Sequence, residues 1–131
     1  MDISIHTSGD KLRPEVLFLS TKLGYRQLRE WVSNLTDKYV VQLKEYDTTA
    51  YPIFLKSCEI ILLEETGGLL DISLDNESFL IKGDKKALDH LAEYFSFMSE
   101  SAPNFHWHID YFEGNQDVLE TNISLVLQVI E

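Results

Sequence analysis

The chain has 131 residues, 44% of them hydrophobic, and a formal net charge of −11 at pH 7. A chain of this length can bury a hydrophobic core without an additional cross-link. Its single cysteine, Cys58, excludes an intramolecular disulfide. No uncharged run approaches the roughly eighteen residues that a membrane span needs, and the N-terminus lacks the pattern of a secretory leader. We therefore expect one domain over residues 1–131, cytoplasmic and without a membrane partner.

The negative charge is concentrated in the second half of the chain. Residues 1–66 contain ten acidic and eight basic side chains, whereas residues 67–131 contain twelve acidic and three basic ones. Such a surface repels a phosphate backbone, so we expect no nucleic-acid partner. It attracts a basic protein. Simple solubility is the alternative explanation of the same charge.

The first elements are two strands and a helix. Residues 2–6 alternate apolar and polar side chains and residues 16–19 are an apolar run, which are two patterns of strands. Thr21 can cap a helix whose positions Tyr25 and Leu28 begin a stripe at helical spacing. The chain is then expected to continue into the rest of a sheet.

Further strands follow this helix. Residues 39–46 alternate as a strand, whereas residues 48–56 contain a proline and are predicted to be a connection or an edge strand. Residues 59–65 and 70–75 are predicted strands, and Gly67-Gly68 between them predicts a tight hairpin turn because two glycines permit positive φ angles.

The stretch from residue 79 to residue 112 carries the strongest pattern. A short strand at 79–81 leads to Asp84, a predicted N-cap, and to an amphipathic helix that Pro103 ends. The apolar stripe of this helix is Leu88, Leu91, Ala92, Phe95, Met98 and Ala102. We also assign the aromatic side chains of both helices to the core. They are Tyr25, Trp31, Tyr94, Phe95 and Phe97.

The last predicted strands are 105–112 and 123–130. In the first of them, alternate residues point to the same side, so His106, His108 and Asp110 share one face. Two imidazoles and a carboxylate could bind zinc, which keeps a metal-dependent enzyme as an alternative hypothesis. The phosphate-binding loops and nucleophile elbows of common enzymes are missing from the sequence. We therefore expect neither an enzyme nor a cofactor.

The two halves look like one pattern used twice. Asp2-Ile3-Ser4-Ile5 recurs as Asp71-Ile72-Ser73-Leu74, and each copy is followed by a strand, a helix and two more strands. This similarity suggests a tandem ββαββ arrangement with pseudo-repeat units 1–66 and 67–131. Coincidence between common patterns is the alternative. Both interpretations predict an α+β two-layer sandwich, with a mostly antiparallel sheet and two helices on one face.

Part of the chain resembles a known family. Phe79-Leu80-Ile81-Lys82-Gly83, the helix with Leu88 and Leu91-Ala92, and His106-Trp107-His108-Ile109-Asp110 are similar to the bacterial immunity protein family numbered thirty-two. The resemblance covers about residues 69–131. It implies an inhibitor that binds a cognate toxin of a polymorphic toxin system stoichiometrically, without turnover. A basic nuclease is one such toxin that an acidic inhibitor would attract.

From this resemblance and the charge we expect the partner to dock on the histidine strand and the turn after it. The predicted contact residues are His106, His108, Asp110, Glu113, Asp117 and Glu120. The histidines would give directional polar contacts and the acidic residues would steer the partner. A third hypothesis is a small structural subunit that associates with itself, as a homodimer, through an exposed strand edge.

Overall fold

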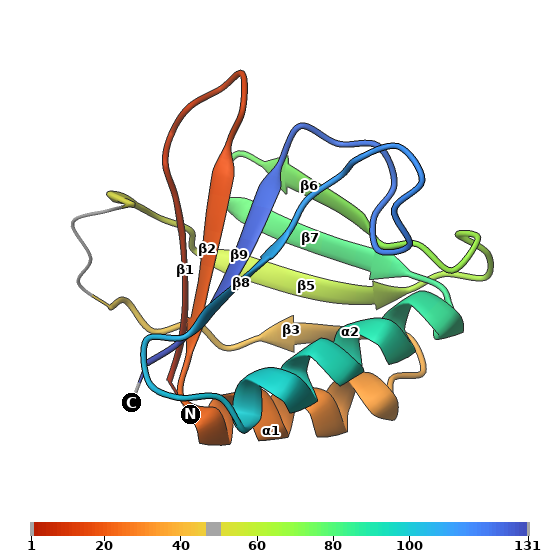
Figure 1. Cartoon of the computed structure of the whole chain (residues 1–131), viewed down its shortest axis with the longest axis horizontal. Helices are drawn as coiled ribbons and strands as arrows, with labels where there is room; N and C mark the ends of the chain where they lie inside the picture. Colours follow the sequence, from red (N-terminus) through yellow and green to blue (C-terminus); the bar gives the residue numbers. More distant parts are fainter. Residues whose placement is uncertain (1, 47–50, 131) are drawn as a thin grey trace.

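The computed structural model describes residues 2–46 and 51–130, which form nine strands and two helices (Figure 1). In chain order the elements are β1 (Ile3–Thr7), β2 (Glu15–Ser20), α1 (Lys22–Ser33), β3 (Lys38–Val41), β4 (Ile53–Phe54), β5 (Ser57–Leu62), β6 (Asp71–Asp75), β7 (Ser78–Gly83), α2 (Lys85–Ser99), β8 (His106–Ile109) and β9 (Ser124–Val129).

The strands form two sheets. One has the order β4-β1-β2-β9-β8 and the other the order β3-β5-β7-β6. Figure 1 shows the strands of one sheet crossing those of the other, with α1 and α2 side by side along one end. The predicted α+β sandwich with two helices is confirmed, and most strand pairs are antiparallel. The strands make two mixed sheets, because β2–β9 and β5–β7 are parallel pairs.

Each sheet contains strands from both halves of the chain. The hairpin β1–β2 of the first half pairs through β2 with β9 of the second half, which pairs in turn with β8. The hairpin β6–β7 pairs through β7 with β5 of the first half, which pairs in turn with β3. The two parallel pairs are the points at which the halves join. Units 1–66 and 67–131 therefore do not form separate sheets. Their origin as a sequence repeat stays a prediction.

Both helices begin at the predicted caps. The Thr21 hydroxyl accepts a hydrogen bond from the Gly24 amide at 3.0 Å, and the Asp84 carboxylate accepts one from the Ala87 amide at 2.9 Å. These caps satisfy amides that have no partner within the first turn. Neither helix of the described segments has the length and apolar character of a membrane-spanning helix.

Three aromatic rings join the helices to the first sheet. Phe18 of β2, Tyr25 of α1 and Phe95 of α2 are completely buried, with ring centroids 5.8 to 6.2 Å apart. The Tyr25 hydroxyl lies 2.8 Å from the Gln128 carbonyl oxygen of β9. Burial raises the pKa of Tyr25 well above its ordinary value, so the phenol stays a hydrogen-bond donor.

The predicted Gly67-Gly68 hairpin is wrong. Both glycines have positive φ angles, +66° and +77°, so the turn itself exists. However, β5 ends at Leu62, and its neighbour is β7, which separates β5 from β6. The amides of Thr66 and Gly68 each donate to the Asp84 carboxylate at 3.0 Å. The turn therefore crosses the N-terminus of α2 and places β6 on the far side of β7.

The predicted strand 39–46 is shorter in the structure, where β3 ends at Val41. After Val41 the chain runs from β3 to the side of β1, where the Lys44 amide donates a hydrogen bond to the Ile3 carbonyl at 2.7 Å. In the segment predicted as a connection or edge strand, Ile53–Phe54 forms edge strand β4 beside β1. Residues 48–50 of that segment lie outside the described residues.

Shortening Leu91 should destabilise the fold. Its side chain is completely buried in α2, so Leu91→Ala removes apolar contacts and leaves a cavity, at a cost of about 2 to 5 kcal/mol. Leu23→Ala is the matched control, because Leu23 lies on α1 with 57% exposure. Urea denaturation measures both. Equal losses of unfolding free energy in the two variants would contradict the assignment of Leu91 to the buried face of α2.

Asp84 should make stability depend on acid pH. Hydrogen bonds from the amides of Thr66, Ala87 and Gly68 lower its pKa from 3.8 to about 2, although burial opposes the shift. The stabilisation is therefore present above pH 4 and lost as the pH falls through about 2. Asp84→Asn keeps a capping oxygen but no charge, and should cost about 1 to 3 kcal/mol at neutral pH.

Denaturation at pH 7, 4 and 2.5 tests this assignment. The difference in unfolding free energy between wild type and Asp84→Asn should shrink between pH 4 and 2.5. Over this range the Asp84 carboxylate gains a proton in the unfolded wild-type chain while it stays largely charged in the folded one, and Asp84→Asn has no such group. A difference that stays constant over this range would show that the charge of Asp84 does not stabilise the fold.

Candidate functional site

Strand β8 is an edge strand with two accessible faces. It pairs only with β9 in the described sheet, in a register that joins His106 to Gln128 and His108 to Val126. The rings of His106 and His108 are exposed and lie side by side, with centroids 5.5 Å apart. Trp107 points to the opposite face. The predicted alternation is thus confirmed for His106–Ile109, whereas the predicted strand 105–112 is shorter in the structure and leaves Asp110 outside β8.

Asp110 does not complete a metal site with the two histidines. Its carboxylate accepts a hydrogen bond from the Ser124 hydroxyl at the start of β9. Within residues 2–46 and 51–130, no three histidine, cysteine or acidic side chains are arranged to hold a metal ion. His106, His108 and Asp110 are therefore not arranged as a three-ligand metal site in these described segments.

The loop that follows β8, residues 110–123, is held in place by two sets of hydrogen bonds. The Asn115 side chain accepts from the amides of Asp117 and Val118 at 2.8 Å each. The Leu70 amide donates to the Asp117 carbonyl, and the Leu119 amide donates to the Leu70 carbonyl, both at 2.8 Å. These bonds fix the loop beside β6.

The six predicted contact residues are divided between several surfaces. His106 and His108 lie on the face of β8 opposite Trp107, whereas Asp117 lies with Trp107 in a cleft against α2. Asp110 lines a different depression of ≈ 670 Å³, beside residues of the 10–15 loop and the start of β9. Glu113 and Glu120 are exposed on the connecting loop. The structure therefore does not bring the set together as one patch.

The cleft against α2 combines aromatic and acidic side chains. It has a volume of ≈ 440 Å³, and its lining residues are His90, Glu93, Tyr94, Phe97, Trp107, Gln116 and Asp117. The first four follow one stripe of α2, at spacings of three and four residues. The assignment of Trp31 to the core is wrong, because it is 38% exposed, and so is that of Phe97, whose side chain is 48% exposed. The sequence contained a signal of this exposure, because Phe97 lies outside the apolar stripe of α2.

Two contacts shape this cleft. The rings of Phe97 and Trp107 meet edge to face, with centroids 5.6 Å apart, and Trp107 is 41% exposed. The Tyr94 hydroxyl donates to the Asp117 carboxylate at 2.6 Å. Burial, followed by this hydrogen bond, raises the pKa of Tyr94 above its ordinary value, so the phenol remains protonated. The cleft thus has an aromatic wall next to a fixed carboxylate.

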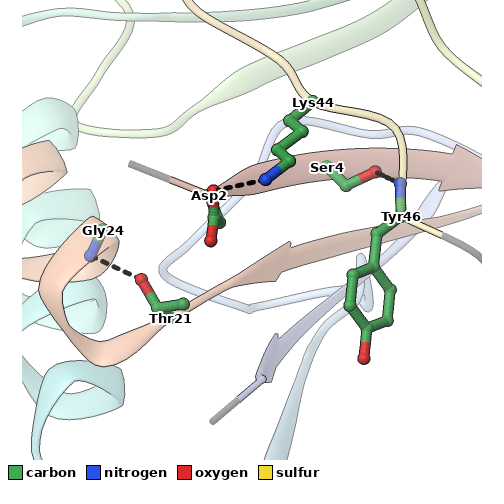
Figure 2. A network of polar contacts seen from close by, with 6 residues as sticks. All are labelled: Asp2, Ser4, Thr21, Gly24, Lys44 and Tyr46. Carbon is green, nitrogen blue, oxygen red and sulfur yellow. Dashed lines mark hydrogen bonds and ion pairs between the residues drawn. The ribbon is translucent and has the colours of Figure 1, made fainter.

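A smaller depression of ≈ 200 Å³ lies where the segment after β3 crosses β1. Figure 2 shows the Tyr46 amide bonded to the Ser4 hydroxyl and the Lys44 ammonium paired with Asp2 at 3.3 Å. Ser4 also shares a hydrogen bond of 2.7 Å with the His6 ring. Both side chains are buried, and burial lowers the pKa of His6. The hydrogen bonds of Ser4 thus hold the segment after β3 against β1, and we assign Ser4 and His6 a structural role.

Cys58 has no role as a surface nucleophile. It is completely buried in β5, and burial raises the pKa of its thiol well above the ordinary value. A reactive cysteine needs a stabilised thiolate that is accessible to its substrate. The cleft against α2 is therefore the stronger candidate site.

Comparison with models of protein families, with curated proteins and with solved structures finds no match. The resemblance to an immunity protein family therefore rests on the short motifs of the sequence alone.

Hydrogen exchange should show that the loop beside the cleft is preformed. The Leu119 amide donates to Leu70, whereas the amides of Glu113 and Gly114 donate no hydrogen bond within the described part of the chain. We expect Leu119 to exchange at least about tenfold more slowly than those two amides. Tyr94→Phe should preserve this difference, because both Leu70 hydrogen bonds remain. Equally fast exchange at all three positions would contradict a fixed loop.

Proposed function

We propose that this protein is a binding protein that captures a basic protein partner and blocks it stoichiometrically. The observation that carries the proposal is the cleft between α2 and β8, in which Phe97 and Trp107 remain exposed next to Glu93 and Asp117. Exposed large aromatic side chains that line a concave surface are typical of protein interfaces. The proposal requires no bond-breaking chemistry and no cofactor.

The aromatic side chains supply the contact area. Trp and Tyr are enriched among the residues that dominate binding energies, since their rings bury much apolar area and lose little conformational freedom. Phe97 and Trp107 are already packed against each other, which reduces the entropy that binding would cost. Phe112, on the loop after β8, is a further exposed aromatic side chain, at 63%.

The charge selects the kind of partner. The net charge of −11 attracts a basic protein over a distance and speeds its encounter with the acidic surface. Glu113 and Glu120 are exposed on the loop beside the cleft, as residues that steer a partner must be. The docking surface that we propose thus keeps Glu113, Asp117 and Glu120 of the predicted contact residues. It adds Trp107 and the side chains of α2 that line the cleft.

We take a bacterial toxin as the proposed partner class, since the resemblance of residues 69–131 implies one. A toxin that is a basic nuclease would match the charge of this surface, and binding would neutralise it in the cytoplasm. Coexpression tests this proposal. The gene of this chain should restore the growth of cells that express the toxin encoded next to it, and the two proteins should copurify at a 1:1 ratio.

Growth that is not restored, together with no complex at micromolar concentrations, would contradict the proposal. Sedimentation of the free protein is the companion measurement. A concentration-dependent dimer that loses its association when Trp107 is replaced would instead support the self-associating subunit, with the edge of β8 as its contact.

Reversing two exposed charges should slow capture of the toxin. Glu113→Lys with Glu120→Lys should lower the association rate by about three- to tenfold at low salt, because exposed charges act mainly on the encounter. The variant should also show a weaker dependence on ionic strength. Asp117 is left unchanged, since its reversal would also break the bond from Tyr94.

The matched control is Glu30→Lys with Glu64→Lys, which gives the same net charge. Glu30 lies on α1 and Glu64 follows β5, and both side chains are exposed. Stopped-flow association at 20 mM and 300 mM salt compares the variants, with salt effects set by a screening length of roughly 20 to 6 Å. Equal rates for the two double variants would show that net charge, rather than this surface, steers the partner.

A further inference from the structure

We infer that the cleft between α2 and β8 receives a single arginine or lysine side chain of the partner. The inference deepens the proposed function and rests on it, because it names the chemical group that this surface recognises. Its basis is the combination in one concave site of two exposed aromatic rings and two carboxylates.

The aromatic wall fits a cation. Phe97 and Trp107 meet at an interplanar angle of 72°, so one ring presents its edge to the other, and the two residues are 48% and 41% exposed. The face of an indole or phenyl ring carries the negative part of its quadrupole, which attracts an ammonium or a guanidinium group. Trp is the strongest of the natural side chains in this role.

The carboxylates fit the same guest. Glu93 is exposed on the cleft wall, and Asp117 is held in position by the Tyr94 hydroxyl, which engages one of its two oxygens. A guanidinium group pairs with such a carboxylate through parallel hydrogen bonds. The lining residues in the described part of the chain include no lysine or arginine, and the basic side chain among them is His90.

A purely apolar guest fits less well. Burying a leucine or phenylalanine side chain against Glu93 and Asp117 would remove water from both carboxylates without giving them a partner. A cationic side chain places its apolar stem along the rings and its charge between the carboxylates. The cleft therefore favours a long basic side chain over an apolar one.

The probe is a short peptide, acetyl-Arg-Gly-Arg-amide, added to the full ¹⁵N-labelled chain at low salt. We expect shifts at the Trp107 indole and the Glu93 amide, with a dissociation constant of about 1 mM or tighter. The same peptide with citrulline in place of arginine keeps the shape and lacks the charge. It should bind at least about fivefold more weakly.

Trp31 is an internal control in the same spectrum. Its ring is also exposed, at 38%, but it packs on Tyr39 with centroids 4.5 Å apart and does not line the cleft. Its indole signal should not move. Equal shifts of both indoles would mean that the peptide binds any exposed aromatic ring, and the inference would be overturned.

Matched variants test the aromatic rings and the carboxylates of the cleft separately. Trp107→Leu and Phe97→Leu keep apolar bulk but remove a ring face, and Glu93→Gln removes one charge. Each should weaken binding of the arginine peptide at least about fivefold. Glu120→Gln changes the same charge outside the cleft lining and should weaken it less than about twofold. Equal effects of Glu93→Gln and Glu120→Gln would overturn the inference.

Two more outcomes are decisive. Tighter binding of acetyl-Leu-Gly-Leu-amide at the cleft would identify an apolar guest and overturn the inference. Capture of the toxin that is unchanged in Trp107→Leu and Phe97→Leu would also overturn it, while leaving the proposed function intact. Binding of the arginine peptide in the cleft, without capture of any neighbouring toxin, would support the cation site and contradict the proposed function.

Discussion

The parallel pairing of β2 with β9, and of β5 with β7, is the constraint on which the architecture depends. Each pairing joins six residues of one half of the chain to six of the other. Both lie at the centre of their sheets, so every other strand is placed relative to them. The Tyr25 hydroxyl reaches Gln128 beside the first pairing, which ties α1 to the same point.

This constraint also positions the candidate site. Strand β8 pairs with β9, and α2 follows β7 directly, so the two walls of the cleft are attached to different sheets. The loop after β8 closes one end, where it is bonded to Leu70 at the start of β6. Phe97 and Trp107 therefore meet because the two sheets have a fixed relative position, rather than through local sequence.

Local features of the chain could be predicted from the sequence. Asp84 is an N-cap and Leu88 to Met98 form a buried stripe, because both patterns depend on neighbours within one helix, whereas the predicted stripe position Ala102 is exposed and lies beyond the end of α2 at Ser99. The alternation of His106 and Trp107 on β8 has the same local origin. Strand pairing depends on distant residues, which is why Gly67-Gly68 indicated a turn correctly and its hairpin wrongly.

The candidate site was predicted only in part for the same reason. Asp117 was assigned to the docking surface from its charge, and the structure places it in the cleft. Phe97 was assigned to the core because aromatic side chains usually are buried. Its 48% exposure follows from its place outside the apolar stripe of α2, which the helical spacing already indicated, whereas its meeting with Trp107 depends on the tertiary fold.

The position of β9 has a consequence for synthesis on the ribosome. The hairpin β1–β2 is made before the other described strands, yet the strand that covers the inner edge of β2 is β9, which follows all of them. Until that strand leaves the exit tunnel, β2 presents unpaired backbone groups and the apolar side chains of Val16 and Phe18. The nascent chain thus keeps this apolar strand edge open while residues 21–123 are made, which is the interval in which chaperones that shield strand edges would matter.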